Sequence, residues 1–251
     1  MDAILTAAHC RDWVDEIHVD RHSFDHDQDY KVSGHRATVS HPYSNLDAFR
    51  YDFAIIFLNE TFRNLDIVKL NRDPNFPNVD TNLTVLGWGA TQWDLTIAPT
   101  YPKVLHQGSV RAISNADCEA TIVMNQALYQ NDIYPEMLCA RDKSVDACSG
   151  DSGGPLIMEN DSSVDVLVGL VSWGRGCALY PGVYGRISAV YDWIREQVCE
   201  QSQDPPVYLQ CDSFAATLSK GKEAVPTVAP AVGAQQELVD NESGVSELQE
   251  G

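Results

Sequence analysis

The chain has 251 residues, of which 44% are hydrophobic and 21% are charged. This balance lets a globular chain bury a sizeable core and excludes wholesale disorder. Asp and Glu number 36 against 17 Lys and Arg, which gives a net charge of −19, so nucleic acids and anionic membranes are not expected as partners. No apolar run reaches the roughly 18 residues that a membrane span needs.

Short apolar runs separated by Gly, Pro, Asn and Asp extend over residues 10–198. Many short strands between turn residues predict an all-β barrel or sandwich. The expected strands are Phe53–Leu58, Leu83–Leu86, Leu156–Met158, Val166–Ser172 and Gly182–Ile187.

Helical periodicity is confined to two segments. Residues 117–124 predict a short helix that Ser114 or Asp117 would cap. Residues 188–198 predict a longer helix, because apolar side chains recur every four residues from Val190 to Val198. Ser188 is the expected cap of this second helix.

The composition changes after the second helix. Residues 200–251 hold nine acidic and two basic residues, and Pro, Ala, Ser, Gln and Val fill most of the rest. Such a segment buries too little apolar surface to fold alone. We expect an acidic, largely disordered C-terminal tail over 200–251.

Seven cysteines, none in a CxxC pair, make a structural zinc site improbable and disulfides the expected state. Six lie between residues 118 and 211 at spacings that suit three local bridges, and Cys10 is left over. Disulfides form in oxidising compartments, and four N-x-S/T sequons beginning at Asn59, Asn82, Asn160 and Asn241 also fit a secreted glycoprotein.

The segment 146–155 is the most informative in the chain. Its glycines, Gly150, Gly153 and Gly154, let the backbone turn sharply around the hydroxyl of Ser152. A turn of this kind can aim two backbone N–H groups at one point, as an oxyanion hole requires. A serine hydroxyl becomes a nucleophile when a histidine takes its proton and a carboxylate fixes the histidine tautomer.

This glycine-rich segment resembles the nucleophile motif of the chymotrypsin/trypsin-like serine proteases. Three further segments resemble that family's motifs in the family's order: 5–10, 51–58, and 171–177 together with 181–184. The resemblance covers about residues 3–198. It implies an all-β fold of two antiparallel six-stranded barrels, with the active site between them and a C-terminal helix.

On this resemblance the protease domain covers residues 1–199. Its first barrel, over about 1–97, is incomplete, and its second covers about 103–199. The segment 98–102 is interpreted as the linker between them.

The resemblance also assigns roles to single residues. It implies His9 as general base, Asp52 as its orienting carboxylate, and Ser152 as nucleophile, with the N–H groups of Gly150 and Ser152 as the oxyanion hole. Asp151 is implied to receive the ammonium group of a newly cleaved N-terminus during activation.

A primary substrate pocket follows from the same comparison. Its residues are implied to be Asp146, at the base, with Ser172, Trp173, Gly174 and Gly182 along the edge and walls. A carboxylate at the base favours Arg or Lys in the substrate. The implied disulfides are Cys118–Cys139 and Cys148–Cys177, and proximity adds Cys199–Cys211.

The expected activity is that of a monomeric serine endopeptidase that cleaves proteins or peptides after Arg or Lys through an acyl-enzyme and needs no cofactor. The alternative is a non-catalytic protease homologue that acts as a secreted binding protein.

The chain departs from the family at its start. Its first residues lack the basic and apolar regions of a signal peptide, and the family's activation site and the partner expected for Cys10 are not found within the chain. We therefore expect an N-terminally truncated chain, and we expect these 251 residues alone to be inactive or poorly folded. If the protein truly begins at Met1, the binding-protein alternative gains weight.

A third hypothesis is a metal-binding or calcium-binding module. Histidines 18, 22 and 26 are spaced as on one helix face, but the apolar residues Ile17 and Val19 suit a strand better. Aspartates 25, 27 and 29 lack the glycine and closing glutamate of an EF-hand. No metal site is expected.

Overall fold

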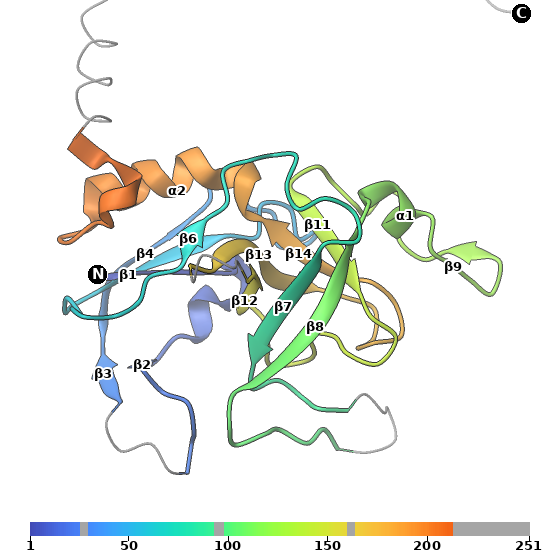
Figure 1. Cartoon of the computed structure of the whole chain (residues 1–251), viewed down its shortest axis with the longest axis horizontal. Coiled ribbons are helices and arrows are strands. Elements are labelled where there is room, and N and C mark those ends of the chain that lie inside the picture. Colours follow the sequence, from blue (N-terminus) through green and yellow to red (C-terminus); the bar gives the residue numbers. More distant parts are fainter. Residues whose placement is uncertain (26–29, 93–97, 160–163, 213–251) are drawn as a thin grey trace, which may run out of the picture. The chain divides into compact units, whose positions relative to one another are not determined.

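The computed structural model describes residues 1–25, 30–92, 98–159 and 164–212 (Figure 1). Of the tail expected over 200–251, residues 213–251 lie outside the described residues, whereas 200–212 include the end of a helix, a 3₁₀ turn and one cysteine of a disulfide. His26, Asp27 and Asp29, and the sequons at Asn160 and Asn241, also lie outside the described residues.

The first half of the chain forms one antiparallel sheet and one strand pair. The sheet has the order β1–β5–β4, with β1 at Ala3–Thr6, β4 at His35–Ser40 and β5 at Ala54–Leu58. Every side chain of β5 is buried, as expected for an apolar run at the centre of a sheet. The separate pair joins β2, Ile17–Val19, to β3, Lys31–Ser33.

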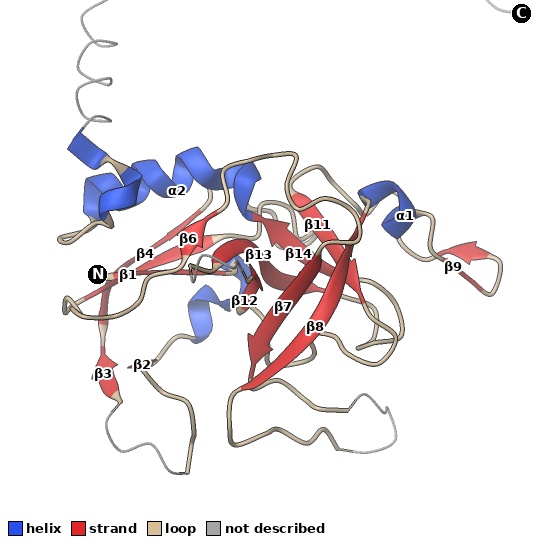
Figure 2. Cartoon of the chain, viewed as in Figure 1, coloured by secondary structure: helices blue, strands red, loops and turns tan. Residues whose placement is uncertain are grey.

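Six strands between residues 82 and 186 form a closed barrel (Figure 2). The ring runs β12–β7–β8–β11–β14–β13 and closes because β13 also pairs with β12. Its strands are β7 (Asn82–Gly87), β8 (His106–Ile113), β11 (Met137–Arg141), β12 (Pro155–Met158), β13 (Val166–Trp173) and β14 (Gly182–Arg186). The short β6, Lys69–Leu70, is added in parallel to β13. The predicted mostly-β fold is thus confirmed.

Strand β7 belongs to the closed barrel although it precedes the expected boundary at residues 98–102. It pairs with β8 and with β12. Residues 98–102, the expected linker, therefore lie in the connection between β7 and β8, which are two strands of the same barrel.

The helices begin and end differently from the prediction. Helix α1 covers Asn115–Glu119, capped by Ser114, whose Oγ accepts a hydrogen bond from the Asp117 N–H at 2.9 Å. The remainder of the predicted helix is a hairpin of β9 (Ile122–Val123) and β10 (Gln126–Ala127). Two left-handed residues, Met124 and Asn125, make its turn.

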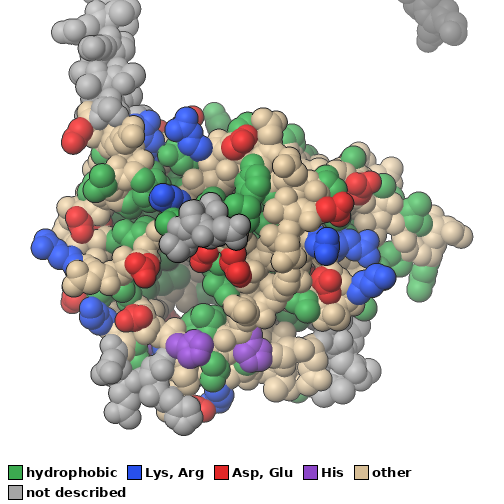
Figure 3. All heavy atoms as spheres, viewed as in Figure 1, with side chains coloured by type: hydrophobic (Ala, Val, Ile, Leu, Met, Phe, Trp, Pro, Cys, Tyr) green, Lys and Arg blue, Asp and Glu red, His purple; other side chains and the backbone are tan. Residues whose placement is uncertain are grey.

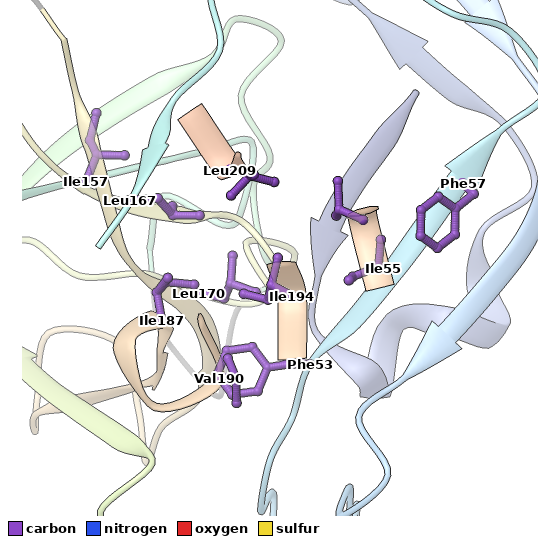
Figure 4. Packing of buried hydrophobic residues seen from close by; sticks show 11 residues of the cluster. Phe53, Ile55, Phe57, Ile157, Leu167, Leu170, Ile187, Val190, Ile194 and Leu209 are labelled. Atoms are coloured by element: carbon purple, nitrogen blue, oxygen red, sulfur yellow. The ribbon is translucent and has the colours of Figure 1, made fainter. Parts of the chain in front are cut away.

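Helix α2 covers Ile187–Gln201 and starts directly after β14, so Arg186 and not Ser188 is its N-cap. A short 3₁₀ helix, Val207–Leu209, follows. The buried side chains of α2 are Ile187, Val190, Ile194 and Val198. They pack with Phe53, Ile55 and Phe57 of the first half and Leu167 and Leu170 of the barrel (Figure 4). One core therefore holds the two halves together.

Three disulfides join Cys118 to Cys139, Cys148 to Cys177, and Cys199 to Cys211. These are the pairs expected from the sequence. The third extends the packed chain beyond α2, since Leu209 is buried in the shared core. Cys10 forms no disulfide within the described residues.

Asp2 is a fully buried carboxylate that ties β1 to the end of α2. It accepts hydrogen bonds from the Arg36 guanidinium at 2.8 Å, the Gln203 N–H at 3.0 Å, and the Ser202 hydroxyl. Burial alone would raise the pKa of Asp2, but these three donors outweigh burial and lower it.

We expect Asp2→Ala to lower the free energy of unfolding by about 3–5 kcal/mol, because it leaves a partly buried guanidinium without its anion. Urea unfolding measures this. The exposed carboxylate of Glu60 provides the control, since Glu60→Ala should change stability by less than about 0.5 kcal/mol. Equal effects of the two substitutions would contradict the role given to Asp2.

Within the described parts of the chain, no helix has the length and apolar character to cross a membrane. Figure 3 shows Lys and Arg side chains interspersed with Asp and Glu on one face.

Candidate active site

His9 and Asp52 are held together by two hydrogen bonds. His9 lies in the 3₁₀ helix Ala8–Trp13, which follows β1 after the buried Ala7. Asp52 lies two residues before the start of β5 and is 2% exposed. The His9 N–H donates to Asp52 Oδ1 at 2.9 Å, and His9 Nδ1 lies 2.7 Å from Oδ2. Since a carboxylate only accepts, Nδ1 carries the proton and Nε2 is left as the basic nitrogen.

Ser172 completes the surroundings of the Asp52 carboxylate. Its hydroxyl donates to Asp52 Oδ2 at 2.6 Å, and Ser172 itself is buried in β13. The hydrogen bond with Asp52, followed by one with Cys10, raises the pKa of His9 above its ordinary value, although burial opposes this. The site thus favours a positive charge on His9 once it accepts a proton.

Ser152 is exposed at the tip of a turn that packs against the segment before His9. Gly150 and Gly153 have φ values of 98° and 76°, which an L side chain rarely adopts. A Cβ on Gly153 would lie 2.2 Å from Thr6 Oγ1 and 3.0 Å from the Ala7 nitrogen. Glycine at this position therefore lets the Ser152 turn approach the chain two residues before His9.

Gly150 and Ser152 carry the two backbone N–H groups that are expected to form the oxyanion hole. The N–H groups of Gly150 and Ser152 donate to no other residue that the structure describes. The intervening Asp151 side chain accepts hydrogen bonds from the N–H groups of Gly89 at 2.7 Å and Cys148 at 2.8 Å. The Met1 ammonium pairs with Asp204 at 2.8 Å. Asp151 is therefore bound to backbone groups and not to the ammonium of Met1.

A cavity of about 180 Å³ opens beside Ser152. It is lined by all five residues implied as substrate-binding, Asp146, Ser172, Trp173, Gly174 and Gly182. The disulfide Cys148–Cys177 joins two of its walls. A Cβ on Gly182 would approach Asp146 Oδ1 to 2.8 Å, so glycine there keeps the space above the carboxylate open.

The Asp146 carboxylate forms hydrogen bonds with three neighbouring groups. It accepts from the N–H groups of Ala147 at 2.9 Å and Ala178 at 3.0 Å. The Tyr184 hydroxyl is 3.5 Å away. Burial raises the pKa of Asp146 to about 6. The cavity therefore presents a carboxylate that gains from a cationic partner.

Sequence analysis missed three groups near this site. The Tyr184 hydroxyl contacts Asp146, and only its place in the 181–184 motif pointed to it. Phe49 meets His9 edge-on, with ring centroids 5.6 Å apart, and Arg50 pairs with Glu136. No periodicity or motif marks Phe49 or Arg50.

The described residues contain no group of three or more His, Cys, Asp or Glu placed to hold a metal ion, and three residues of the metal hypothesis, His26, Asp27 and Asp29, lie outside them. His18 lies in β2 and stacks on Tyr30, with ring centroids 4.8 Å apart.

Comparisons with known proteins show which family the chain is similar to. The family model described as trypsin matches residues 1–194. The chain is 34% identical over 201 residues to trypsin 5G1 of Aedes aegypti, across 77% of this chain and 70% of the relative. It is 32% identical over 200 residues to trypsin theta of Drosophila melanogaster, across 77% and 71%. Hypodermin-B of Hypoderma lineatum is 33% identical over 214 residues, across 78% and 73%.

Proposed function

Because the chain belongs to the trypsin family of serine endopeptidases, we propose that it cleaves polypeptides after Arg or Lys with Ser152, His9 and Asp52 as its catalytic residues. The observation that carries this proposal is the convergence of His9, buried Asp52 and the Ser152 turn beside a cavity with a carboxylate at its base.

In the first step, His9 Nε2 takes the proton of the Ser152 hydroxyl while Oγ attacks the scissile carbonyl carbon. Asp52 holds the other ring nitrogen and stabilises the imidazolium that forms. The carbonyl oxygen becomes negative and accepts hydrogen bonds from the Gly150 and Ser152 N–H groups. One such donor is worth about 2.7–4 kcal/mol in the transition state.

The second half of the reaction reverses these roles. His9 gives its proton to the leaving amine as the C–N bond breaks, and an acyl-enzyme remains on Ser152. Water then attacks the ester carbonyl and gives a proton to His9. The Ser152 oxygen leaves, regains that proton and releases the carboxylic acid product. No cofactor takes part.

The substrate cation enters the cavity beside Ser152. A guanidinium or ammonium group reaches Asp146 past Gly174 and Gly182, and a charge-assisted contact holds it. Digestion of an unfolded protein by the purified chain tests this specificity. We expect new C-termini at Arg and Lys. Cleavage after other residues would contradict the assignment of Asp146. If the purified chain cleaves nothing, the binding-protein alternative is favoured.

The raised pKa of Asp146 predicts a pH dependence of cation binding. Below about pH 6 the carboxyl group is protonated and neutral, so affinity for a guanidinium falls up to tenfold for each further pH unit. Calorimetric titration with phenylguanidine between pH 8 and pH 4 measures this. Asp146→Asn should bind weakly at every pH, and equal, pH-independent binding by both proteins would refute the prediction.

The proposed place of action is outside the cell. The three disulfides form in oxidising compartments. Two of the sequon asparagines, Asn59 and Asn82, are exposed and so accessible to glycosylation. Detection of the endogenous protein only inside cells, with reduced cysteines, would contradict this placement.

A further inference from the structure

The segment that leads into Asp52 is held in an unusual backbone conformation. Phe49 and Tyr51 have φ values of 48° and 47°, in the left-handed region that non-glycine residues rarely adopt. Asn45 and Arg50 exchange backbone hydrogen bonds at 2.9 and 3.0 Å and so close the turn. Such conformations persist where surrounding contacts fix them, so the segment needs an anchor.

Arg50 supplies an anchor on the closed barrel. Its guanidinium donates to the Glu136 carboxylate, which is 4% exposed. It also lies over the Tyr134 ring, 3.9 Å from the centroid. The Glu136 carbonyl accepts from the Arg186 N–H at 2.9 Å, next to the junction of β14 and α2. The ion pair therefore joins the turn before β5 to a rigid part of the other half of the molecule.

The anchored segment contacts His9 through two of its residues. Phe49 packs edge-on against the His9 ring and stacks on Trp173, with centroids 6.2 Å apart. Three residues after Phe49, Asp52 forms a hydrogen bond with His9. The Tyr51 ring stacks on His41, with centroids 4.7 Å apart. A shift of this turn would therefore move an aromatic support and the carboxylate of His9 together.

We propose that Arg50 is a positioning residue for catalysis: its ion pair with Glu136 fixes the 49–52 turn and, through Phe49 and Asp52, the orientation of the His9 ring. This inference rests on the proposed catalytic roles of His9 and Asp52. A planar guanidinium suits the position because it pairs with a carboxylate and stacks on an aromatic face at once, which an ammonium group does less well.

Arg36 provides a matched control for stability. Its guanidinium also pairs with a buried carboxylate, that of Asp2, and lies 5.3 Å from the centroid of the Phe57 ring. Neither Arg36 nor Asp2 contacts the residues assigned to catalysis. Arg36→Ala and Arg50→Ala thus each remove an ion pair with a buried carboxylate, but only Arg50 belongs to the turn that contacts His9.

Steady-state kinetics on one Arg-containing peptide separates the two roles. We expect Arg50→Ala to lower kcat about tenfold, as for a small misplacement of a reacting group, while KM changes less than threefold. Arg50→Lys should recover part of the loss. At temperatures below the melting temperature of the variant, Arg36→Ala should change kcat and KM by less than about twofold. Equal effects of Arg36→Ala and Arg50→Ala would overturn the proposal.

A double-mutant cycle with Asp52→Asn is the decisive readout. If Arg50 acts through Asp52 and His9, Arg50→Ala should change kcat less than twofold once Asp52 is already replaced. A further tenfold loss in that background would mean an independent structural effect and would overturn the proposal. Glu136→Gln, which keeps the shape of the partner, repeats the cycle if Arg50→Ala does not fold.

The outcome also separates this inference from the proposed function. If the wild-type protein and Ser152→Ala cleave the peptide equally poorly, the proposed function fails, and the positioning role falls with it. If the wild-type protein cleaves and Arg50→Ala matches it in both constants, only the positioning role fails.

Discussion

We expect Ser152→Ala to abolish peptide cleavage, with a loss in kcat on the order of 10⁶-fold. Gly150 and Gly153 hold the turn that carries Oγ in conformations that only glycine adopts readily, and alanine keeps this turn but removes the hydroxyl. The residual rate would come from the oxyanion donors and from binding alone. Single-turnover assays with a fluorogenic Arg peptide are sensitive enough to measure this residual rate.

The matched control for this prediction is Ser109→Ala. The Ser109 hydroxyl donates to Asn82 at 2.8 Å on β8, outside the candidate site. We expect its turnover to equal that of the wild-type protein. A Ser152→Ala variant that keeps more than about a thousandth of wild-type activity would show that another group is the nucleophile.

We expect Asp146→Asn to lower kcat/KM for Arg and Lys peptides on the order of 10⁴-fold, the discrimination typical of a buried polar site that loses its matched partner. A substrate cation in this cavity gives up water and receives no counter-charge from the amide. The asparagine keeps the size of the aspartate, so the packing around Ala178 and Tyr184 should change little.

Peptides that differ only in the residue before the cleaved bond measure this effect. Turnover of a Phe or Leu peptide should change less than tenfold in Asp146→Asn, because the cavity walls and the catalytic residues stay the same. An Arg preference that survives the substitution would mean that the substrate cation binds elsewhere.

Sequence patterns predicted those parts of the molecule that local chemistry fixes. The apolar run before Asn59 became the fully buried β5, and the glycines around Ser152 became the turn that they indicated. The residues implied for the substrate pocket line one cavity. In each case a short segment contains the residues that determine its own conformation.

The features that depend on distant contacts were not predictable in this way. Ser188 has the side chain of a helix cap, but β14 continues without a loop into α2, so the cap falls on Arg186. The predicted helix after Ser114 ends early because its second part pairs as a hairpin. The Arg50–Glu136 ion pair joins residues 86 positions apart, and neither residue belongs to a local pattern.

Covalent labelling with a fluorophosphonate tests the central claim most directly. The Ser152 oxygen would attack phosphorus and displace fluoride, leaving one phosphonyl group on the protein. We expect intact mass spectrometry to find a single adduct, peptide mapping to place it on Ser152, and Ser152→Ala to remove it. Labelling that bypasses Ser152, or a wild-type protein that remains unlabelled, would contradict the assignment of Ser152 as the nucleophile.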